Sequence, residues 1–261
     1  MSLPPGPPRI ASLVPSLSEL ACALGLGPWM VARTGYCIHP ADALAAVPRI
    51  GGTKDVNLAK LRRLAPTHVL VNVDENRLDT VEALRAFVPQ IVVTHPCAPQ
   101  DNLALLAQFV AVFGAVPGVA ERAAALADAL REALAETAAR RWPGERVLYL
   151  IWRAPWMTVA RDTYIARMLA CVGWQTLPAL EGGERGAARY PRVEPGAAWL
   201  AEVDRVLLSS EPYRFGPEHV AEAQALCPRA RVQCIDGELL GWYGPRAAAG
   251  LRHLQMLAAP Q

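Results

Sequence analysis

The sequence predicts an α/β protein with two parallel-sheet lobes, one long rigid helix that joins them and a ligand cleft between the lobes. Short apolar, β-rich segments alternate with helical stretches, which is typical of parallel α/β layers. An Ala/Leu-rich helical segment, Val119–Arg141, interrupts this alternation, which then resumes. We therefore expect an N-terminal lobe over residues 9–115, a linker helix over 116–143 and a C-terminal lobe over 144–261.

The first half contains four candidate strands and two helix starts. The strands are expected at Arg9–Val14, Met30–Arg33, His68–Val73 and Gln90–Thr94. Ser16-Leu17-Ser18-Glu19 has the pattern of a capping box, which predicts the start of the first helix. Asn57 is expected to cap a helix over Leu58–Leu64, which Pro66 ends.

The second half repeats the alternation after the long helix. Strands are expected at Arg146–Ile151, Trp156–Ala160, Arg205–Ser210 and Arg231–Asp236. Asp162 is in position to cap a helix that runs through Cys171. The sequence has no short-period repeat, so the two halves are alike only in being α/β.

Composition excludes several classes of protein. The 26 basic and 24 acidic residues give a net charge of +2, which does not favour a nucleic acid partner. No apolar run approaches the ~20 residues needed to cross a bilayer, so we expect no membrane insertion. Met1–Pro8 lacks the basic and apolar regions of a signal peptide.

The six cysteines are scattered and form no CxxC pair, which favours reduced thiols. Together with the N-terminus, they predict a cytoplasmic protein, and we expect a monomer. A periplasmic location is the alternative, for a protein whose signal peptide has been removed.

Aromatic residues gather in the segments that follow the expected strands. Ligands of open parallel sheets bind outside the carboxyl ends of the strands. Wide aromatic faces with a few polar anchors suit a large, flat, partly apolar ligand. The candidate aromatic residues are Tyr36, Trp152, Trp156, Tyr213 and Trp242, and the candidate polar anchors are Glu75, Arg153 and Glu211. Packing in the core or between the lobes is the alternative interpretation of each aromatic residue.

A second candidate site consists of Cys37, His39, His95 and Cys97, which follow the second and fourth strands. Two Cys and two His suit a tetrahedral Zn²⁺ or an axial ligand for a bound metal complex. The C-x-H and H-x-C spacings are tighter than those of common zinc motifs. We therefore expect no stoichiometric metal, with the histidines acting as turn or cleft residues. Motifs for dinucleotides, a Walker lysine loop, a nucleophile elbow and an HExxH zinc site are all absent.

Several segments together resemble one protein family from Arg9 to the last helix. They are Ser12–Leu20, Pro48–Gly52, Asn57-Leu58, Leu64–Val71 and Tyr190–Val193. In their order and spacing they are similar to the iron-siderophore/vitamin B12 periplasmic-binding protein family, also called class III substrate-binding proteins or helical-backbone metal receptors. The resemblance implies two α/β lobes joined by a long helix, in agreement with the pattern of the residues.

The resemblance implies binding rather than catalysis, with no obligatory cofactor. Members of the family hold a small-molecule metal chelate, namely a corrinoid such as cobalamin or cobinamide, haem or a ferric siderophore, and pass it to an ABC permease. Cleft-lining aromatic positions of B12-binding members match Tyr36 and Tyr190, and the loop Trp152–Trp156 falls at another cleft-lining segment. A metal-dependent cytoplasmic enzyme or a metal-handling protein on the same fold is one alternative. An exported receptor of an ABC transporter is the other.

The residues that such receptors use to dock on a permease depart from the family pattern. The resemblance implies one exposed Glu on each lobe, and this chain has Ala59 and Gly196 at the matching positions. Glu194 lies two residues from the second position. We therefore expect that the chain does not dock on a B12-type permease in the usual way.

Overall fold

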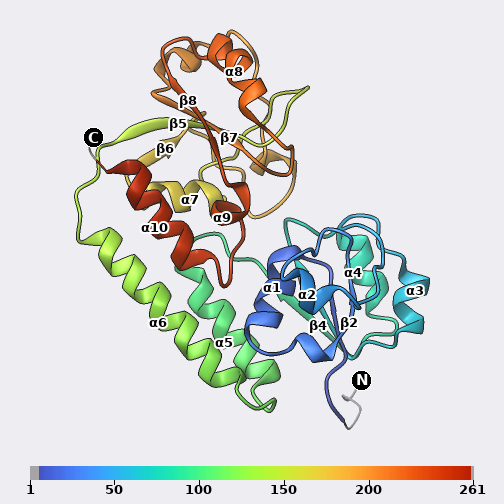
Figure 1. Cartoon of the computed structure of the whole chain (residues 1–261). Coiled ribbons are helices and arrows are strands. Elements are labelled where there is room, and N and C mark those ends of the chain that lie inside the picture. The colour runs from blue at the N-terminus through green and yellow to red at the C-terminus, as the bar shows by residue number, and fades with distance from the viewer. Residues whose placement is uncertain (1–5, 260–261) are drawn as a thin grey trace. The chain divides into compact units, whose positions relative to one another are not determined.

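The computed structural model describes residues 6–259, which form two units with one four-stranded parallel sheet each (Figure 1). The predicted fold class of two parallel-sheet α/β lobes is confirmed. Met1–Pro5 lie outside the described residues, and so does the part of the N-terminal expectation that concerns them. Within the described range, no helix combines the length and the apolar composition needed to cross a membrane.

Neither unit is one continuous stretch of sequence. The first contains the described residues up to Pro96, Asn102–Asp128 and Tyr243–Pro245. The second contains Cys97–Asp101, Ala129–Trp242 and the described residues from Arg246 onward. The boundary between the two units therefore falls inside the long helix that was expected to stand between two lobes.

In the first unit the strands follow the order β2-β1-β3-β4. Apolar side chains of α3 and α4 pack on strand residues such as Ala11, Val69 and Val71 to form a core on one face of the sheet. The elements are β1 (Ile10–Ser12), α1 (Pro15–Ala23), β2 (Met30–Arg33), α2 (Ala41–Leu44), α3 (Leu58–Arg63), β3 (His68–Asn72), α4 (Leu78–Leu84), β4 (Gln90–Thr94) and α5 (Asp101–Phe113).

Two helix starts test the capping predictions. The side chain of Asn57 accepts a hydrogen bond from the Lys60 backbone N–H at 2.8 Å, so this predicted cap is confirmed. The predicted capping box before α1 is wrong. The helix begins at Pro15, whose ring presets a helical φ, and the N-cap residue Val14 makes no side-chain cap. The Ser18 hydroxyl instead donates to the Val14 carbonyl at 3.0 Å.

The long helix α6 (Val119–Ala138) begins at the predicted residue and ends three residues before the predicted end. Its buried residues recur every three or four positions, which is the stripe of an amphipathic helix. They are Val119, Ala123, Ala127, Leu130, Ala133 and Thr137. In the second unit, the Gln255 amide of α10 (Ala247–Ala258) donates to the Thr137 hydroxyl at 2.9 Å.

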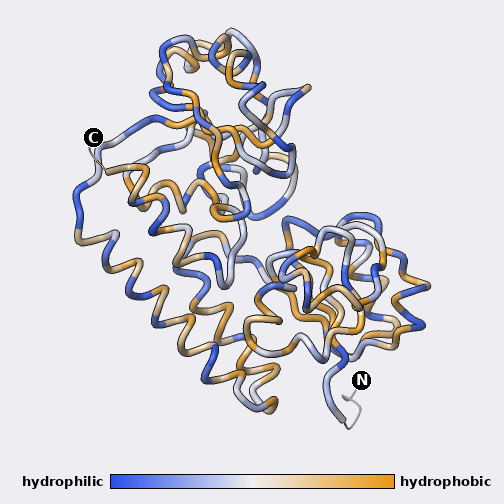
Figure 2. Tube along the Cα trace, viewed as in Figure 1, coloured by the Kyte–Doolittle hydropathy of each residue, from blue (hydrophilic) through white to orange (hydrophobic). Residues whose placement is uncertain are grey.

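In the second unit the strands follow the order β6-β5-β7-β8. Figure 2 shows hydrophobic residues along much of the central strands β5 and β7 of this sheet. The elements are β5 (Glu145–Leu150), α7 (Tyr164–Ala170), β6 (Trp174–Thr176), β7 (Arg205–Ser209), α8 (Val220–Leu226), β8 (Arg231–Ile235), α9 (Gly237–Gly241) and α10. The last four residues of β5 and every residue of β7 are buried, as expected for central strands of a covered parallel sheet.

The expected strand Trp156–Ala160 is not part of this sheet. Its backbone pairs locally, because the Met157 N–H donates to the Trp152 carbonyl at 3.1 Å and the Thr158 N–H donates to the Pro191 carbonyl at 3.0 Å. The fourth strand is β6, which the sequence pattern did not predict. Asp162 does not cap α7 either, since the Thr163 hydroxyl accepts from the Ala166 N–H, while the Asp162 carboxylate accepts from the Gly182 N–H at 2.9 Å.

A largely buried ion pair joins the first residues of β5 and β7 in the second unit. Arg205 at the start of β7 donates to Glu145 at 2.6 Å and 2.9 Å, and its guanidinium lies 4.5 Å from the centre of the Trp174 ring. Only 6% of the Arg205 side chain and 15% of the Glu145 side chain are exposed. Arg231 also pairs with Glu145 at 2.8 Å.

We predict that Arg205→Met lowers the free energy of unfolding by about 3 kcal/mol, because it leaves a largely buried carboxylate with one partner fewer. The matched control is Arg146→Met, which breaks an exposed pair with Asp204 and should lower the free energy of unfolding much less. Urea unfolding followed by circular dichroism measures both values. Equal losses in the two variants would contradict the buried pair's role.

Candidate functional site

A tight hairpin follows β5 and places three candidate ligand-binding residues, namely Trp152, Arg153 and Trp156. Met157 pairs with Trp152 on one side and with Arg192 on the other, in antiparallel bridges. The Val193 N–H also donates to the Trp156 carbonyl at 2.8 Å. The loop Trp152–Trp156 is therefore fixed at both ends and fastened to the segment after Tyr190.

Five rings form an aromatic cluster beside this hairpin. The cluster consists of Trp152, Trp156, Tyr213, Phe215 and His219. Trp152 meets Tyr213 edge to face with ring centres 5.7 Å apart, and Trp156 lies parallel to the buried Phe215 at 6.0 Å. Trp152 keeps 41% of its surface exposed. The cluster therefore has a buried base and an open aromatic face, which is the form of a stacking surface for a flat ligand.

An open groove of about 420 Å³ lies next to the cluster. Its apolar part includes Trp156, Pro155 and the buried Val193. Its charged lining residues are Arg153, Arg192, Glu194 and Glu222, of which Arg153 and Glu222 form an ion pair at 2.7 Å. An apolar floor with a charged rim can hold a partly apolar molecule and orient its polar substituents.

Glu211 follows β7 and is hydrogen-bonded to Trp242. The Trp242 indole N–H donates to the Glu211 carboxylate, and the Arg246 guanidinium lies 4.7 Å from the centre of the same indole ring. Trp242 is only 7% exposed, so its ring offers little surface to a ligand. The pKa of Glu211 is raised to about 7, chiefly by burial and also by the Glu238 and Asp236 carboxylates, whereas the Trp242 N–H and Arg246 act to lower it.

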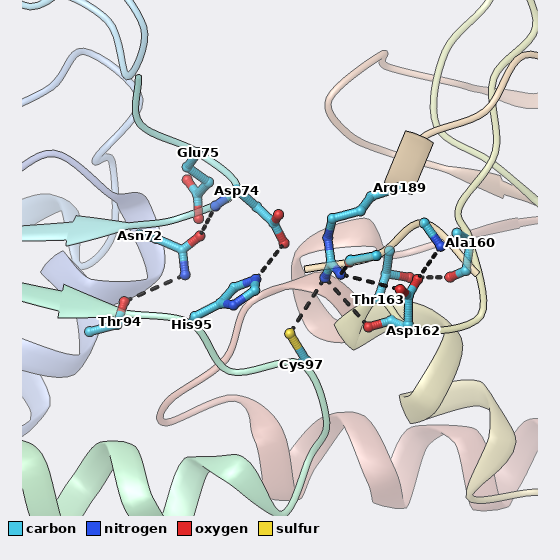
Figure 3. Close-up of polar contacts among 12 residues, drawn as sticks. Asn72, Asp74, Glu75, Thr94, His95, Cys97, Ala160, Asp162, Thr163 and Arg189 are labelled. Carbon is cyan, nitrogen blue, oxygen red and sulfur yellow. Dashed lines mark hydrogen bonds and ion pairs between the residues drawn. The ribbon is translucent and has the colours of Figure 1, made fainter. Parts of the chain in front are cut away.

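In the first unit, Tyr36 and Glu75 follow β2 and β3. Tyr36 is 65% exposed and lies against Gly52. The Glu75 carboxylate accepts a hydrogen bond from the buried Tyr243 hydroxyl at 2.9 Å. Figure 3 shows the neighbouring Asp74 directed at His95, whose Nε2 lies 3.5 Å from the Asp74 carboxylate. Glu75 and Asp74 thus have partners within their own unit.

The described residues show no metal centre formed by the four-residue Cys/His set. Among residues 6–259, no group of three or more His, Cys, Asp or Glu side chains could hold a metal ion. Cys37 is buried with its sulfur 3.1 Å from the Thr34 hydroxyl, and burial raises its pKa, which disfavours the thiolate that binds metals. Cys97 belongs to the second unit, where the buried Arg189 donates to its sulfur at 3.5 Å (Figure 3). His39 lies in the turn before Pro40.

The structure thus divides the predicted ligand-binding residues into groups. Trp152, Arg153, Trp156 and Tyr213 lie together around one hairpin, whereas Glu211 and Trp242 form a separate pair. Tyr190 is half-buried and directly precedes the segment that pairs with the hairpin. Sequence reasoning missed Phe215 and His219. The alternation of Tyr213 and Phe215 after a strand was the available signal, because alternate residues of an extended segment share a face.

No protein-family model matches the sequence. Solved structures, in contrast, are similar to the chain over nearly its whole length. The chain is similar to the periplasmic vitamin B12 binding protein BtuF of Vibrio cholerae, with a TM-score of 0.79, 20% identity and coverage of 97% of this chain and 98% of that one. It is also similar to the periplasmic heme binding protein HutB of Vibrio cholerae, with a TM-score of 0.77, 22% identity and coverage of 97% and 99%.

A curated relative gives a shorter match. The vitamin B12-binding protein of Photorhabdus laumondii subsp. laumondii is 31% identical over 111 residues, which are 41% of this chain and 40% of that protein. The match thus spans well under half of the relative's length. Together with the solved structures it confirms the resemblance that the sequence motifs predicted, and the chain has the fold of these periplasmic binding proteins.

The predicted cytoplasmic location is wrong. The proteins with the same fold are periplasmic binding proteins, which points to an exported protein. The six cysteines, all of which lie in the described range, form no disulfide, and this observation does not fix the compartment.

We predict that the contribution of Glu211 to the stability of the protein falls as pH rises from about 4.5 to about 7 and then levels off. The folded pKa of Glu211 lies above its ordinary value, so the folded protein holds this proton more tightly than the unfolded chain does. Glu211→Gln keeps an acceptor for the Trp242 N–H but cannot ionise, and its stability should depend less on pH. Urea midpoints at about pH 5 and about pH 8 measure the difference. The exposed Glu202→Gln serves as the control, and an unchanged pH dependence in Glu211→Gln would contradict the prediction.

Proposed function

We propose that the protein is an exported substrate-binding protein for a small-molecule metal chelate of the corrinoid, haem or ferric siderophore type, and that it is not an enzyme. The observation that carries the proposal is the partly exposed aromatic cluster at the carboxyl end of β5, on a fold shared with B12- and haem-binding proteins. A flat chelate would stack on the open face of Trp152 while its substituents reach the charged rim of the groove.

The alternative of a metal-dependent enzyme has little support. It depended on a catalytic metal held by Cys37, His39, His95 and Cys97, and these residues do not assemble into a ligand set. The similar proteins are binding proteins by name. The ligand itself, rather than a bound cofactor, would therefore carry the metal.

A binding screen tests this proposal. The full chain is titrated with cyanocobalamin, cobinamide, haem and ferric siderophores, and tryptophan fluorescence and calorimetry report binding. We expect saturable binding of at least one chelate with one ligand per chain. Failure of every chelate to bind would overturn the proposal.

We predict that Trp152→Ala weakens binding of the identified chelate by about 1–3 kcal/mol, the cost of losing an aromatic anchor. The control is Trp142→Ala, which removes a half-buried tryptophan whose N–H donates to the Thr137 carbonyl at the end of the long helix. If Trp152→Ala keeps the wild-type affinity, the assignment of the binding surface is wrong.

We further propose that docking on a B12-type ABC permease does not use the usual pair of glutamates. Ala59 is exposed on the first turn of α3, and Gly196 has a φ of +88°, a left-handed conformation that favours glycine over glutamate. Because neither residue carries a charge, the ion pairs that fix register across such an interface cannot form. We therefore expect no stimulation of the ATPase activity of a reconstituted B12-type permease. Stimulation by the wild-type protein would contradict this expectation.

A further inference from the structure

The outer side of α3 carries basic side chains and no acidic one. Lys60, Arg62 and Arg63 lie on this helix, and no Asp or Glu occurs anywhere from residue 56 to residue 73. Arg62 and Arg63 are exposed, and Lys60 is partly exposed. The opposite side of the helix faces the core of the first unit through the buried Leu61. Figure 1 shows α3 at the periphery of this unit.

A further cation reaches the same helix from a distant part of the sequence. The Arg9 guanidinium donates to the carbonyl groups of Leu64 at 2.6 Å and Ala65 at 3.0 Å, directly after the last residue of α3. Arg9 is itself exposed, so its charge adds to that of the helix. The term basic surface is used below for the group of Arg9, Lys60, Arg62 and Arg63.

The stability of the helix does not account for this charge. Cations near the C-terminus of a helix interact favourably with its last carbonyl groups. Arg9 already binds the carbonyl groups of Leu64 and Ala65. The Arg62 guanidinium instead lies 5.1 Å from the centre of the Phe87 ring, a cation–π contact that orders this side chain. Within residues 6–259, no carboxylate forms an ion pair with any member of the basic surface.

The basic surface lacks the apolar anchor of a stable protein interface. Such interfaces are organised around aromatic or aliphatic side chains at their centre, where charged residues are depleted. Within α3, all of which the structure describes, Ala59 is the one exposed apolar residue, and Leu58 packs on the core. Adsorption onto anionic lipid headgroups needs charge alone, and a cluster of about four Lys or Arg side chains is typical of it. Because α3 exposes no large apolar side chain, such contact stays at the headgroups.

We propose that the basic surface adsorbs the protein onto a membrane that contains anionic phospholipid, through contacts with the headgroup phosphates. Arginine suits this chemistry because its planar guanidinium donates two parallel hydrogen bonds to two phosphate oxygens. Each basic side chain near such a membrane raises the partition coefficient about fivefold. This contact goes beyond the proposed function and needs no bound chelate.

Vesicle sedimentation tests the proposal with the full chain. Vesicles of phosphatidylcholine with about 30 mol% phosphatidylglycerol, which supplies the negative surface charge, are compared with vesicles of phosphatidylcholine alone. We expect wild-type protein to bind only the anionic vesicles in about 10 mM salt. About 1 M salt should release it, because the screening length falls from about 30 Å to about 3 Å. Anionic vesicles should also protect Arg62 and Arg63 from modification by phenylglyoxal, read by mass spectrometry, and should leave Arg140 and Arg141 unprotected.

Two charge-reversed variants locate the contact. Arg62→Glu/Arg63→Glu should lower the partition coefficient at least about 25-fold, because it removes two attractive charges that contribute about fivefold each and adds two repulsive ones. The matched control is Arg140→Glu/Arg141→Glu, which changes the net charge equally at another exposed pair, where Arg140 lies over the Trp142 ring. It should keep most of the wild-type binding. Arg63→Gln, a milder change, should lower binding about fivefold. Circular dichroism confirms that each variant is folded.

Every result of these experiments supports or overturns the membrane contact. Equal binding to both kinds of vesicle, or no binding in low salt, would overturn it. So would equal losses in the two charge-reversed variants, since binding would then follow the net charge of the chain. Binding to poly-L-glutamate but not to anionic vesicles would assign the basic surface to an acidic protein instead. None of these results bears on the proposed function, which the chelate titrations test separately.

Discussion

The backbone of Met157 is the constraint on which the candidate site depends. It pairs with Trp152 in one direction and with Arg192 in the other, so one residue holds both the hairpin after β5 and the segment that faces it. Trp152 and Arg153 owe their positions to this pairing, since without it the loop would have no fixed ends. Side chains that bind a rigid ligand need such support, because each ordered side chain otherwise costs conformational entropy when the ligand binds.

The sequence pattern predicted strands correctly where an apolar run also takes a position in one of the two sheets. Met30–Arg33 and Gln90–Thr94 are strands with the predicted bounds, because apolar β-rich runs between turn residues have few other places to pack. Trp156–Ala160 has the same local pattern but pairs with neighbouring loops. The three-residue strand β6, which follows α7 closely, is too short to leave a period. Local pattern indicates an extended backbone, and only tertiary contacts decide which partner it takes.

The candidate site was predictable in its residue types and less so in their roles. The position of aromatic residues after parallel strands indicated Trp152 and Tyr213, which do lie together. Trp242 has the same sequence context, but a buried hydrogen bond to Glu211 takes up its polar edge. His219 lies beyond the segments that directly follow the strands. Its tautomer is fixed by the Gly216 backbone N–H, which donates to its Nδ1. Such a relation depends on three-dimensional geometry and leaves no trace in composition or spacing.

The short segment Tyr243–Pro245 has a consequence for how this chain can be divided or recombined. These three residues belong to the first unit although the sequence around them belongs to the second. They are held by hydrogen bonds. The Tyr243 hydroxyl donates to the Glu75 carboxylate, and the Gly244 N–H donates to the side-chain oxygen of the buried Asn102. A gene fragment that ends within α6 would therefore encode a first unit without its own last piece. Exchange of units between homologous proteins has to carry this distant tripeptide along with the N-terminal part, so in evolution and in engineering the two halves are inherited together.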